Sequence, residues 1–252
     1  YRRRRKFFLM EHLLNKKHFL YDDDIGNVEL VQFMGEDITI VNSARVSFGV
    51  HKEELDSKDE KLIHYLMKHR HTSTLEHNIA TFRIKVPLFI RSQHHRHRTW
   101  SYNEISRRYT DFNLEFYTPN EFRTQHKSNR QSSNIEDKID PLLDFDVSYA
   151  STPLTMQSSE AVRRHHKASI DLFDKLLAEG VCKEQARGVL PQNLYTEYYA
   201  TANLNNILKF IGLRTHDGAQ WEIQQLANNM LDIITEIWPV AVGSYREINS
   251  HV

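Results

Sequence analysis

The chain has 252 residues, 40% of them hydrophobic, which is enough for a substantial core in one large domain or two small ones. Lys and Arg number 33, and Asp and Glu also number 33, so the formal net charge is zero and any basic function must be local. The single cysteine, Cys182, excludes an intramolecular disulfide and a cysteine-rich zinc site, and favours a reducing, cytoplasmic compartment. No stretch approaches the roughly 18 apolar residues of a membrane span, so we expect no membrane association.

Strand patterns dominate the first half of the chain. After a basic N-terminal extension over residues 1–25, residues 28–42 favour two strands joined by a turn at Gly35 and Glu36. The other elements expected before residue 100 are a helix over 59–69, a polar turn over 69–77, a strand over 79–86 that ends at Pro87, and a short helix over 88–95.

Helical patterns dominate the second half. Residues 118–158 are polar and predict a long excursion with little regular structure, which is either a surface insertion or a lid over a site. A helix is predicted from Ser159 to Gly180, and further helices over 196–213 and 220–237. Strands followed by long helices indicate a single α+β (mixed α/β) domain over 1–252, with a central sheet. Neither GxGxxG nor a P-loop is present, which argues against the usual dinucleotide and NTP folds.

The most informative segment is 96–108, Arg-His-Arg-Thr-Trp-Ser-Tyr-Asn-Glu-Ile-Ser-Arg-Arg. Guanidinium groups bind phosphate in a bidentate manner and stack on planar rings, so this composition predicts a site for a phosphate and a planar heterocycle. Ser101 and Glu104 also match a helix capping box, which is the structural alternative for these two residues.

Three further segments are rich in polar residues. His71, Glu76 and His77 raise the possibility of a metal, but HExxH spacing and a second ligand cluster are missing, so we expect no metal. Arg187 precedes Leu190-Pro191. Asn203 and Arg214 are eleven residues apart, which is close to three helical turns, so they share a helix face.

Together these segments resemble the flavin-dependent thymidylate synthases. The family motif, Arg-His-Arg, seven residues, then Ser, is present as Arg96-His97-Arg98 and Ser106, and the fuller form RHRxxSxNExSxR is matched through Arg108. The resemblance covers roughly residues 40–235, and its other matching positions are Ala44-Arg45-Val46-Ser47, His71, Glu76-His77, Ala186-Arg187, Leu190-Pro191, Asn203, Arg214, Ala219-Gln220 and Glu222-Ile223.

The resemblance implies an enzyme that makes dTMP from dUMP, with methylenetetrahydrofolate as carbon donor and FAD reduced by NADPH. It also implies a mixed α/β fold and a homotetramer whose active sites are shared between subunits, with no nucleic-acid partner. The dUMP contacts expected by matching position are Gln93, His94, His95, Arg96, Glu104, Ile105, Ser106, Arg107, Arg108, Arg187 and Arg214. The FAD contacts expected in the same way are His71, Ser73, Arg96, His97, Arg98, Glu104, Asn203, Asn205 and Lys209.

The resemblance also assigns catalytic roles to Arg214, Ser106 and Glu104. Cys182 lies outside every polar cluster, in keeping with a family that uses no cysteine nucleophile. Reduced flavin would deliver the hydride, and Arg214 would polarise the pyrimidine. Ser106 has no His–Asp relay beside it in the sequence and is interpreted as a positioning hydroxyl.

Two substitutions depart from the family pattern at the expected flavin edge. Asn205 stands where an arginine is frequent, and Lys209 stands where Asn or His is usual.

Two other readings of the sequence stay open. A nucleic-acid-binding protein would use 94–98 with Arg107 and Arg108 as a phosphate-binding stripe, and would show strongly salt-dependent binding. A histidine-metal hydrolase would hold a stoichiometric metal. Neither alternative explains the downstream spacing of Arg187, Asn203 and Arg214.

Overall fold

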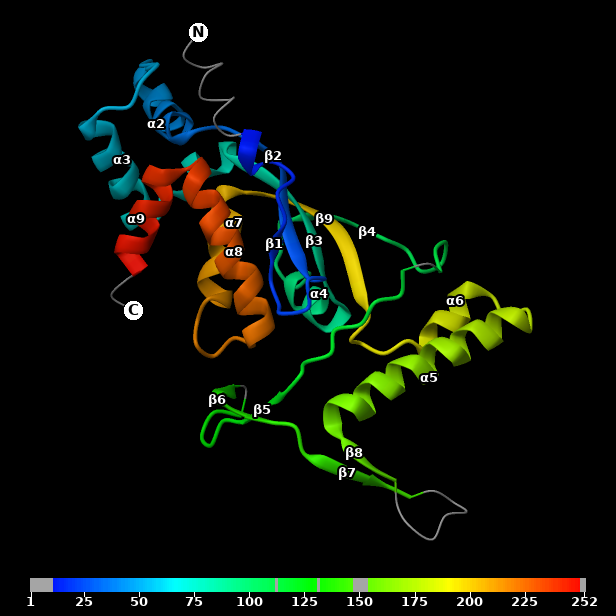
Figure 1. Cartoon of the computed structure of the whole chain (residues 1–252). Helices are drawn as coiled ribbons and strands as arrows, with labels where there is room; N and C mark the ends of the chain where they lie inside the picture. Colours follow the sequence, from blue (N-terminus) through cyan, green and yellow to red (C-terminus); the bar gives the residue numbers. More distant parts are fainter. Residues whose placement is uncertain (1–10, 112, 131, 147–153, 250–252) are drawn as a thin grey trace.

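A computed structural model describes residues 11–111, 113–130, 132–146 and 154–249 (Figure 1). Its centre is an antiparallel five-stranded sheet. In spatial order, the strands are β1 (His18–Phe19), β2 (Asn27–Met34), β3 (Ile79–Pro87), β9 (Tyr195–Asn203) and β4 (Ser101–Glu104). The nine-residue strands β3 and β9 pair along their whole length and form the middle of the sheet.

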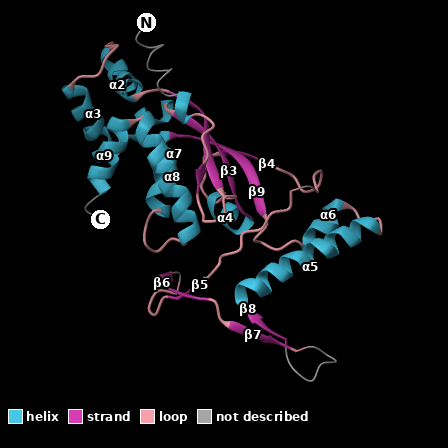
Figure 2. Cartoon of the chain, viewed as in Figure 1, coloured by secondary structure: helices cyan, strands magenta, loops and turns pink. Residues whose placement is uncertain are grey.

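Helices and two small hairpins surround this sheet (Figures 1 and 2). The α-helices are α2 (Asp37–Arg45), α3 (Ser57–Lys68), α4 (Leu88–His94), α5 (Ser158–Ala178), α6 (Lys183–Ala186), α7 (Leu204–Arg214), α8 (Trp221–Ile237) and α9 (Pro239–Asn249). Short 3-10 helices are η1 (Glu11–Leu13), η2 (Val46–Phe48), η3 (Thr72–His77) and η4 (Arg187–Val189).

The core lies between the sheet and helices α7 and α8. Helix α8 buries the apolar stripe expected from its 3.6-residue period, which includes Ile223, Leu226 and Met230. Phe82 of β3 and Tyr198 of β9 are also almost fully buried in this cluster. Burial of this surface holds α7 and α8 against the strands that carry the site.

The α+β fold is confirmed, and so are the helices expected over 59–69, 88–95, 159–180 and 220–237. The polar turn over 69–77 contains η3. None of the described helices is long and apolar enough to cross a membrane.

The prediction of a strand after Gly35 was wrong, because Asp37–Arg45 forms helix α2. Glu36 and Thr39 form a reciprocal capping box at its start, with the Glu36 backbone N–H donating to the Thr39 hydroxyl at 3.0 Å. The buried Asp37 carboxylate accepts backbone N–H groups of Val240 and Ala241 at the start of α9. Tertiary contacts therefore override the local strand preference of this segment.

Two further expectations were wrong around the sheet. The predicted helix over 196–213 is strand β9 up to Asn203 and helix α7 only after it. The pair Ser101 and Glu104 lies in strand β4, so it is not a capping box. Helix α9 was not predicted, although Pro239 suits a first helical turn.

Residues 118–158 hold more regular structure than the sequence indicates. They contain two hairpins, which are β5 (Phe122–Gln125) with β6 (Ser133–Ile139), and β7 (Leu142–Phe145) with β8 (Leu154–Gln157). The first ten residues of the expected N-terminal extension lie outside the described residues. The rest of that extension joins the fold, because Leu13, Leu20 and Tyr21 are buried in the core.

Candidate active site

The arginine-rich motif lies on the connection between α4 and β4, and a buried histidine anchors it. His94 ends α4 and is fully buried. Its Nδ1 lies 2.8 Å from the Tyr198 hydroxyl. Burial keeps the pKa of His94 well below its ordinary value, so the ring is neutral. The side chain of His94 therefore lies inside the protein, away from any surface that a nucleotide could reach.

The C-terminus of α7 is hydrogen-bonded to this motif. Arg214 Nε donates to His97 Nε2 at 3.0 Å, and Arg214 Nη2 donates to the Gln93 carbonyl at 3.4 Å. Burial, followed by the nearby Arg214 charge, lowers the pKa of His97 to about 4. Burial and then the neighbouring Arg96 lower the pKa of Arg214. A neutral His97 thus acts as the acceptor that orients a partly buried guanidinium.

A hollow of about 510 Å³ lies on the other side of α4. Among the predicted dUMP contacts it is lined by Glu104, Ile105, Ser106, Arg107 and Arg187. Arg187 is exposed and bonds to no carboxylate of the described residues, which leaves its guanidinium available for an anion.

The residues of this hollow that were not predicted as contacts include the polar Arg91, Gln192 and Thr196. Arg91 Nε and the Thr196 hydroxyl donate to Glu104 Oε1 at 3.1 and 2.6 Å, so they fix this carboxylate. The one sequence signal for Arg91 was that it lies two residues before Gln93, a predicted dUMP contact.

The other arginines of the motif differ in how firmly they are held. Arg107 donates to the Asn113 carbonyl at 3.2 Å. Arg108 donates to Glu184 at 3.3 Å. Arg96 and Arg98 are exposed and have no carboxylate partner among the described residues. Each of the last two therefore offers a guanidinium to a ligand.

His95 is half-buried beside Tyr102. Its ring is 4.1 Å from that of Tyr102, between centroids, and burial lowers its pKa. The Ser106 hydroxyl accepts the Arg108 backbone N–H at 3.3 Å, which suits a positioning role for Ser106.

Four of the predicted flavin contacts line two hollows near η3 and α7. His71 and Ser73 are exposed and line a hollow of about 520 Å³. Asn205 and Lys209 line another of about 430 Å³, and Arg70 and Thr72 line both. The two hollows are therefore neighbours.

Two asparagines of this region have their side chains engaged in the fold. Asn203 Oδ1 caps α7 by accepting the Asn206 N–H at 3.0 Å. The buried Asn205 donates to Glu76 Oε1 at 3.1 Å. Asn205, which stands where the family often has an arginine, thus links α7 to η3 through this hydrogen bond.

One chain does not bring all these groups together. Thr196 lines the 510 Å³ hollow, and Asn203 lies at the start of α7, beside the predicted flavin contacts. The two residues are seven positions apart on β9, which corresponds to about 20 Å of strand. Arg91 and Gln93 also project from opposite sides of α4, because two helical residues turn through about 200°. The predicted dUMP contacts are therefore split between the hollow and the Arg214 group.

The described residues contain no group of three His, Cys, Asp or Glu side chains arranged to hold a metal ion. Cys182 is exposed at the start of α6 and is not among the residues that line the hollow.

Comparisons with known proteins identify the family of this chain. A family model described as "Thymidylate synthase complementing protein" matches residues 29–240. The chain is 41% identical over 224 residues to a flavin-dependent thymidylate synthase of Thermus thermophilus, which covers 89% of this chain and 77% of that protein. It is 36% identical over 226 residues to the enzyme of the same name from Thermosipho melanesiensis, with 90% and 93% covered.

A solved structure is similar over nearly the same length. The UMP/dUMP methylase PolB from Streptomyces cacaoi, bound with 5-Br dUMP, superposes with a TM-score of 0.71 at 30% identity, covering 87% of this chain and 94% of that one. The family model and the curated relatives each extend over most of the chain, including the arginine-rich motif, Arg187 and Arg214. The chain is therefore an enzyme that belongs to the flavin-dependent thymidylate synthase family.

Proposed function

We propose that this enzyme converts dUMP to dTMP, with methylenetetrahydrofolate as carbon donor and FAD, reduced by NADPH, as hydride source. The observation that carries the proposal is the Arg214–His97 hydrogen bond of 3.0 Å, which holds the end of α7 against the arginine-rich motif. The similarity to an enzyme whose structure holds 5-Br dUMP supports dUMP as the substrate.

The nucleotide would be held mainly by arginines. Arg187 and Arg107 line the hollow together with Ser106 and would offer donors to a phosphate, and Arg108, which now contacts Glu184, would join them. Glu104, fixed by Arg91 and Thr196, would accept from a ligand N–H or O–H group. His94 contributes by anchoring the loop from within the core.

Arg214 would carry the main catalytic effect. Carbon 5 of uracil is a poor nucleophile, and a fixed cation beside the ring stabilises the negative charge that develops during the reaction. Preorganised donors of this kind contribute about 3 to 4 kcal/mol. Arg214 is already held by His97 and by the Gln93 carbonyl, so little reorganisation is needed when the substrate binds.

The residues near η3 and α7 fit a flavin nucleotide. Arg96 and Arg98 have uncommitted guanidiniums for its phosphates, and His71, Ser73 and Lys209 line adjoining hollows. When bound, the reduced flavin supplies the hydride that completes the methyl group. Asn203, Asn205 and His97 would support this region through the hydrogen bonds they already make.

A complete site would need more than one subunit. Thr196 of the 510 Å³ hollow and Asn203 at the start of α7 are about 20 Å apart along β9, whereas hydride transfer requires contact between flavin and pyrimidine. We therefore include a homotetramer with shared active sites in the proposal. This assembly explains why residues expected at one site are split within the chain.

The direct test is an omission assay. The purified protein, incubated anaerobically with dUMP, methylenetetrahydrofolate, FAD and NADPH, should form dTMP, which chromatography detects. Omission of any one component should abolish the product. Formation of dTMP without flavin, or no dTMP with all four components present, would contradict the proposal.

A variant assigns the catalytic role. Arg214→Ala should retain flavin but lose at least about 100-fold in the rate of dTMP formation, because about 3 kcal/mol of charge stabilisation is removed. Turnover within a few-fold of wild type would show that Arg214 has another role.

A further inference from the structure

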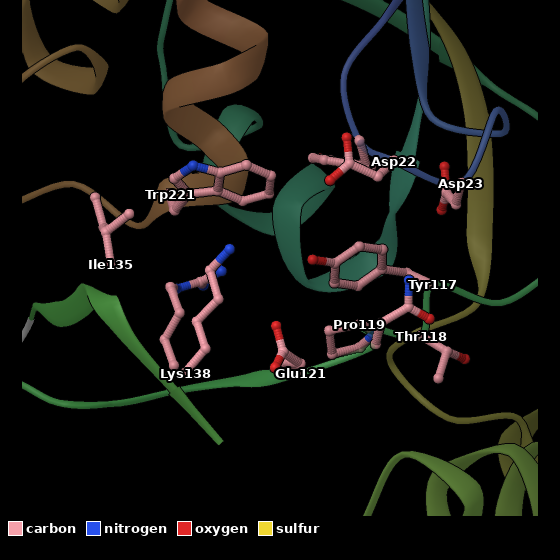
Figure 3. Close-up of a pocket in the computed structure, with 12 residues that line it drawn as sticks. Asp22, Asp23, Tyr117, Thr118, Pro119, Glu121, Ile135, Lys138 and Trp221 are labelled. Atoms are coloured by element: carbon pink, nitrogen blue, oxygen red, sulfur yellow. The ribbon is translucent and has the colours of Figure 1, made fainter. Parts of the chain in front are cut away.

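A further pocket is lined by none of the residues predicted to contact dUMP or flavin. It has a volume of about 400 Å³ and is located between the β5–β6 hairpin and the start of α8. In Figure 3 the Trp221 indole lies above it, the Tyr117 hydroxyl points into it, and Lys138 rises toward Trp221 from the hairpin. Arg123 of β5 also lines it, with its guanidinium carbon 5.3 Å from the centroid of the Trp221 ring.

Beside this pocket, Arg123 reaches a buried carboxylate. Glu222 is 4% exposed. Arg123 Nη2 donates to both of its oxygens, at 2.8 and 2.9 Å. The Tyr117 hydroxyl donates to Oε1 at 3.1 Å. A buried carboxylate is costly unless it is paired and hydrogen-bonded, so Arg123 and Tyr117 hold the Glu222 side chain in one position.

The ionised carboxylate fixes the direction of the next two side chains. An ionised carboxylate only accepts hydrogen bonds, so Gln220 must turn its amide N–H₂ toward Glu222, and its Nε2 donates at 2.9 Å. Gln220 Oε1 then faces Gln93, whose Nε2 donates to it at 2.6 Å. Gln93 Oε1 is left as the acceptor that a ligand would meet.

This chain of contacts ends at the candidate active site. The carbonyl of Gln93 accepts from Arg214, the residue proposed to polarise the pyrimidine. Three side-chain contacts therefore connect a hairpin of the polar excursion to a predicted dUMP contact, through Glu222 and Gln220.

We propose that Arg123 is a positioning residue for the nucleotide site, which acts through Glu222 and Gln220 to fix the side-chain amide of Gln93. This role rests on the proposed function, because it assumes that Gln93 contacts dUMP. Arg123 itself touches no substrate. Without it, the Glu222 carboxylate would lose the partner that binds both of its oxygens, and the amides of Gln220 and Gln93 would lose their single orientation.

A double-mutant cycle on the flavin-loaded protein tests this role. The dissociation constant of dUMP is measured by calorimetry for wild type, Arg123→Gln, Gln93→Ala and the double variant. Arg123→Gln should weaken binding about fivefold, as expected for a hydrogen bond that is no longer well oriented. In the Gln93→Ala background the same change should have no further effect.

Lys138→Gln is the matched control. Lys138 faces Arg123 across the hairpin and carries the same charge, but it has no ion-pair partner among the described residues. Its substitution should leave the affinity for dUMP unchanged. An equal loss in this variant would attribute the effect to hairpin charge and overturn the positioning role.

The outcomes separate this role from the proposed function. Additive losses in the cycle, in a protein that binds dUMP, would overturn the positioning role alone. A wild-type protein that binds flavin but no dUMP would overturn the proposed function as well. If Arg123→Gln does not fold, Arg123→Lys, which keeps the charge but cannot reproduce the guanidinium geometry, provides the same cycle with the same two outcomes.

Discussion

Mixed oligomers of two inactive variants test whether the active site is shared. Arg187→Ala damages the 510 Å³ hollow, and Arg214→Ala damages the group on the other side of α4. If one chain supplies the hollow and another supplies Arg214, a mixed oligomer contains some sites with both parts intact. When equal amounts associate at random, each site receives an intact hollow with a probability of one half and an intact Arg214 with a probability of one half. About a quarter of the sites should therefore be active.

The assay uses co-expression of the two variants with different affinity tags, followed by sequential purification and measurement of dTMP formation. The matched control combines Arg187→Ala with Ser106→Ala. Both residues line the same hollow of one chain, so no combination of these subunits can restore it. Recovery in the first mixture and none in the control is the expected result. Equal inactivity of both mixtures would refute the reasoning that the parts come from different subunits.

Four further predictions concern single residues. His71→Ala should lower flavin retention, measured as bound FAD per chain after gel filtration, because His71 lines the predicted flavin hollow; an unchanged ratio would remove it from that site. Cys182→Ser should leave dTMP formation unchanged, because the thiol is exposed and does not line the hollow, and a large loss of rate would reveal a role for it. The pKa of His97 is about 4 in the folded chain, below the ordinary value of 6.5. As pH drops from 6.5 toward 4, the unfolded chain takes up a proton at this residue before the folded chain does, so the free energy of unfolding should fall. A melting temperature that does not change over this range would contradict the burial of a neutral ring. Trp238→Ala should cost about 3 to 5 kcal/mol in denaturant unfolding, because Trp238 is fully buried and its Nε1 donates to the Gly35 carbonyl at 2.9 Å; a cost below about 1 kcal/mol would refute its place in the core.

Local periodicity was sufficient to predict an element that packs on the core along one continuous face. Helix α8 was predicted almost to the residue because Ile223, Leu226 and Met230 follow a clear 3.6-residue period. Strand β9 was missed, although it does alternate, with Tyr198, Ala200 and Ala202 buried on one face. The apolar run of α7 directly after it concealed this change of period.

Long-range contacts account for most of what the sequence could not provide. Helix α2 depends in part on Asp37, which binds two N–H groups of α9 more than 200 residues away. The Arg123–Glu222 and Gln93–Gln220 contacts span 99 and 127 residues. No local pattern marks such pairs.

The candidate site was predicted mainly from the resemblance. The arginine-rich motif alone indicated anion binding, but its pairing with Arg214 came from the structure. The inward position of His94 and the division of the dUMP contacts between two faces of α4 also became visible only in three dimensions.

The most direct test of the central claim is an absorbance spectrum of the flavin-loaded protein, recorded anaerobically after addition of NADPH, with and without dUMP. We expect the flavin bands to bleach, and to bleach faster with dUMP, because the two ligands meet in one site. A protein that binds no flavin, or a bleaching rate that is unaffected by saturating dUMP, would contradict it.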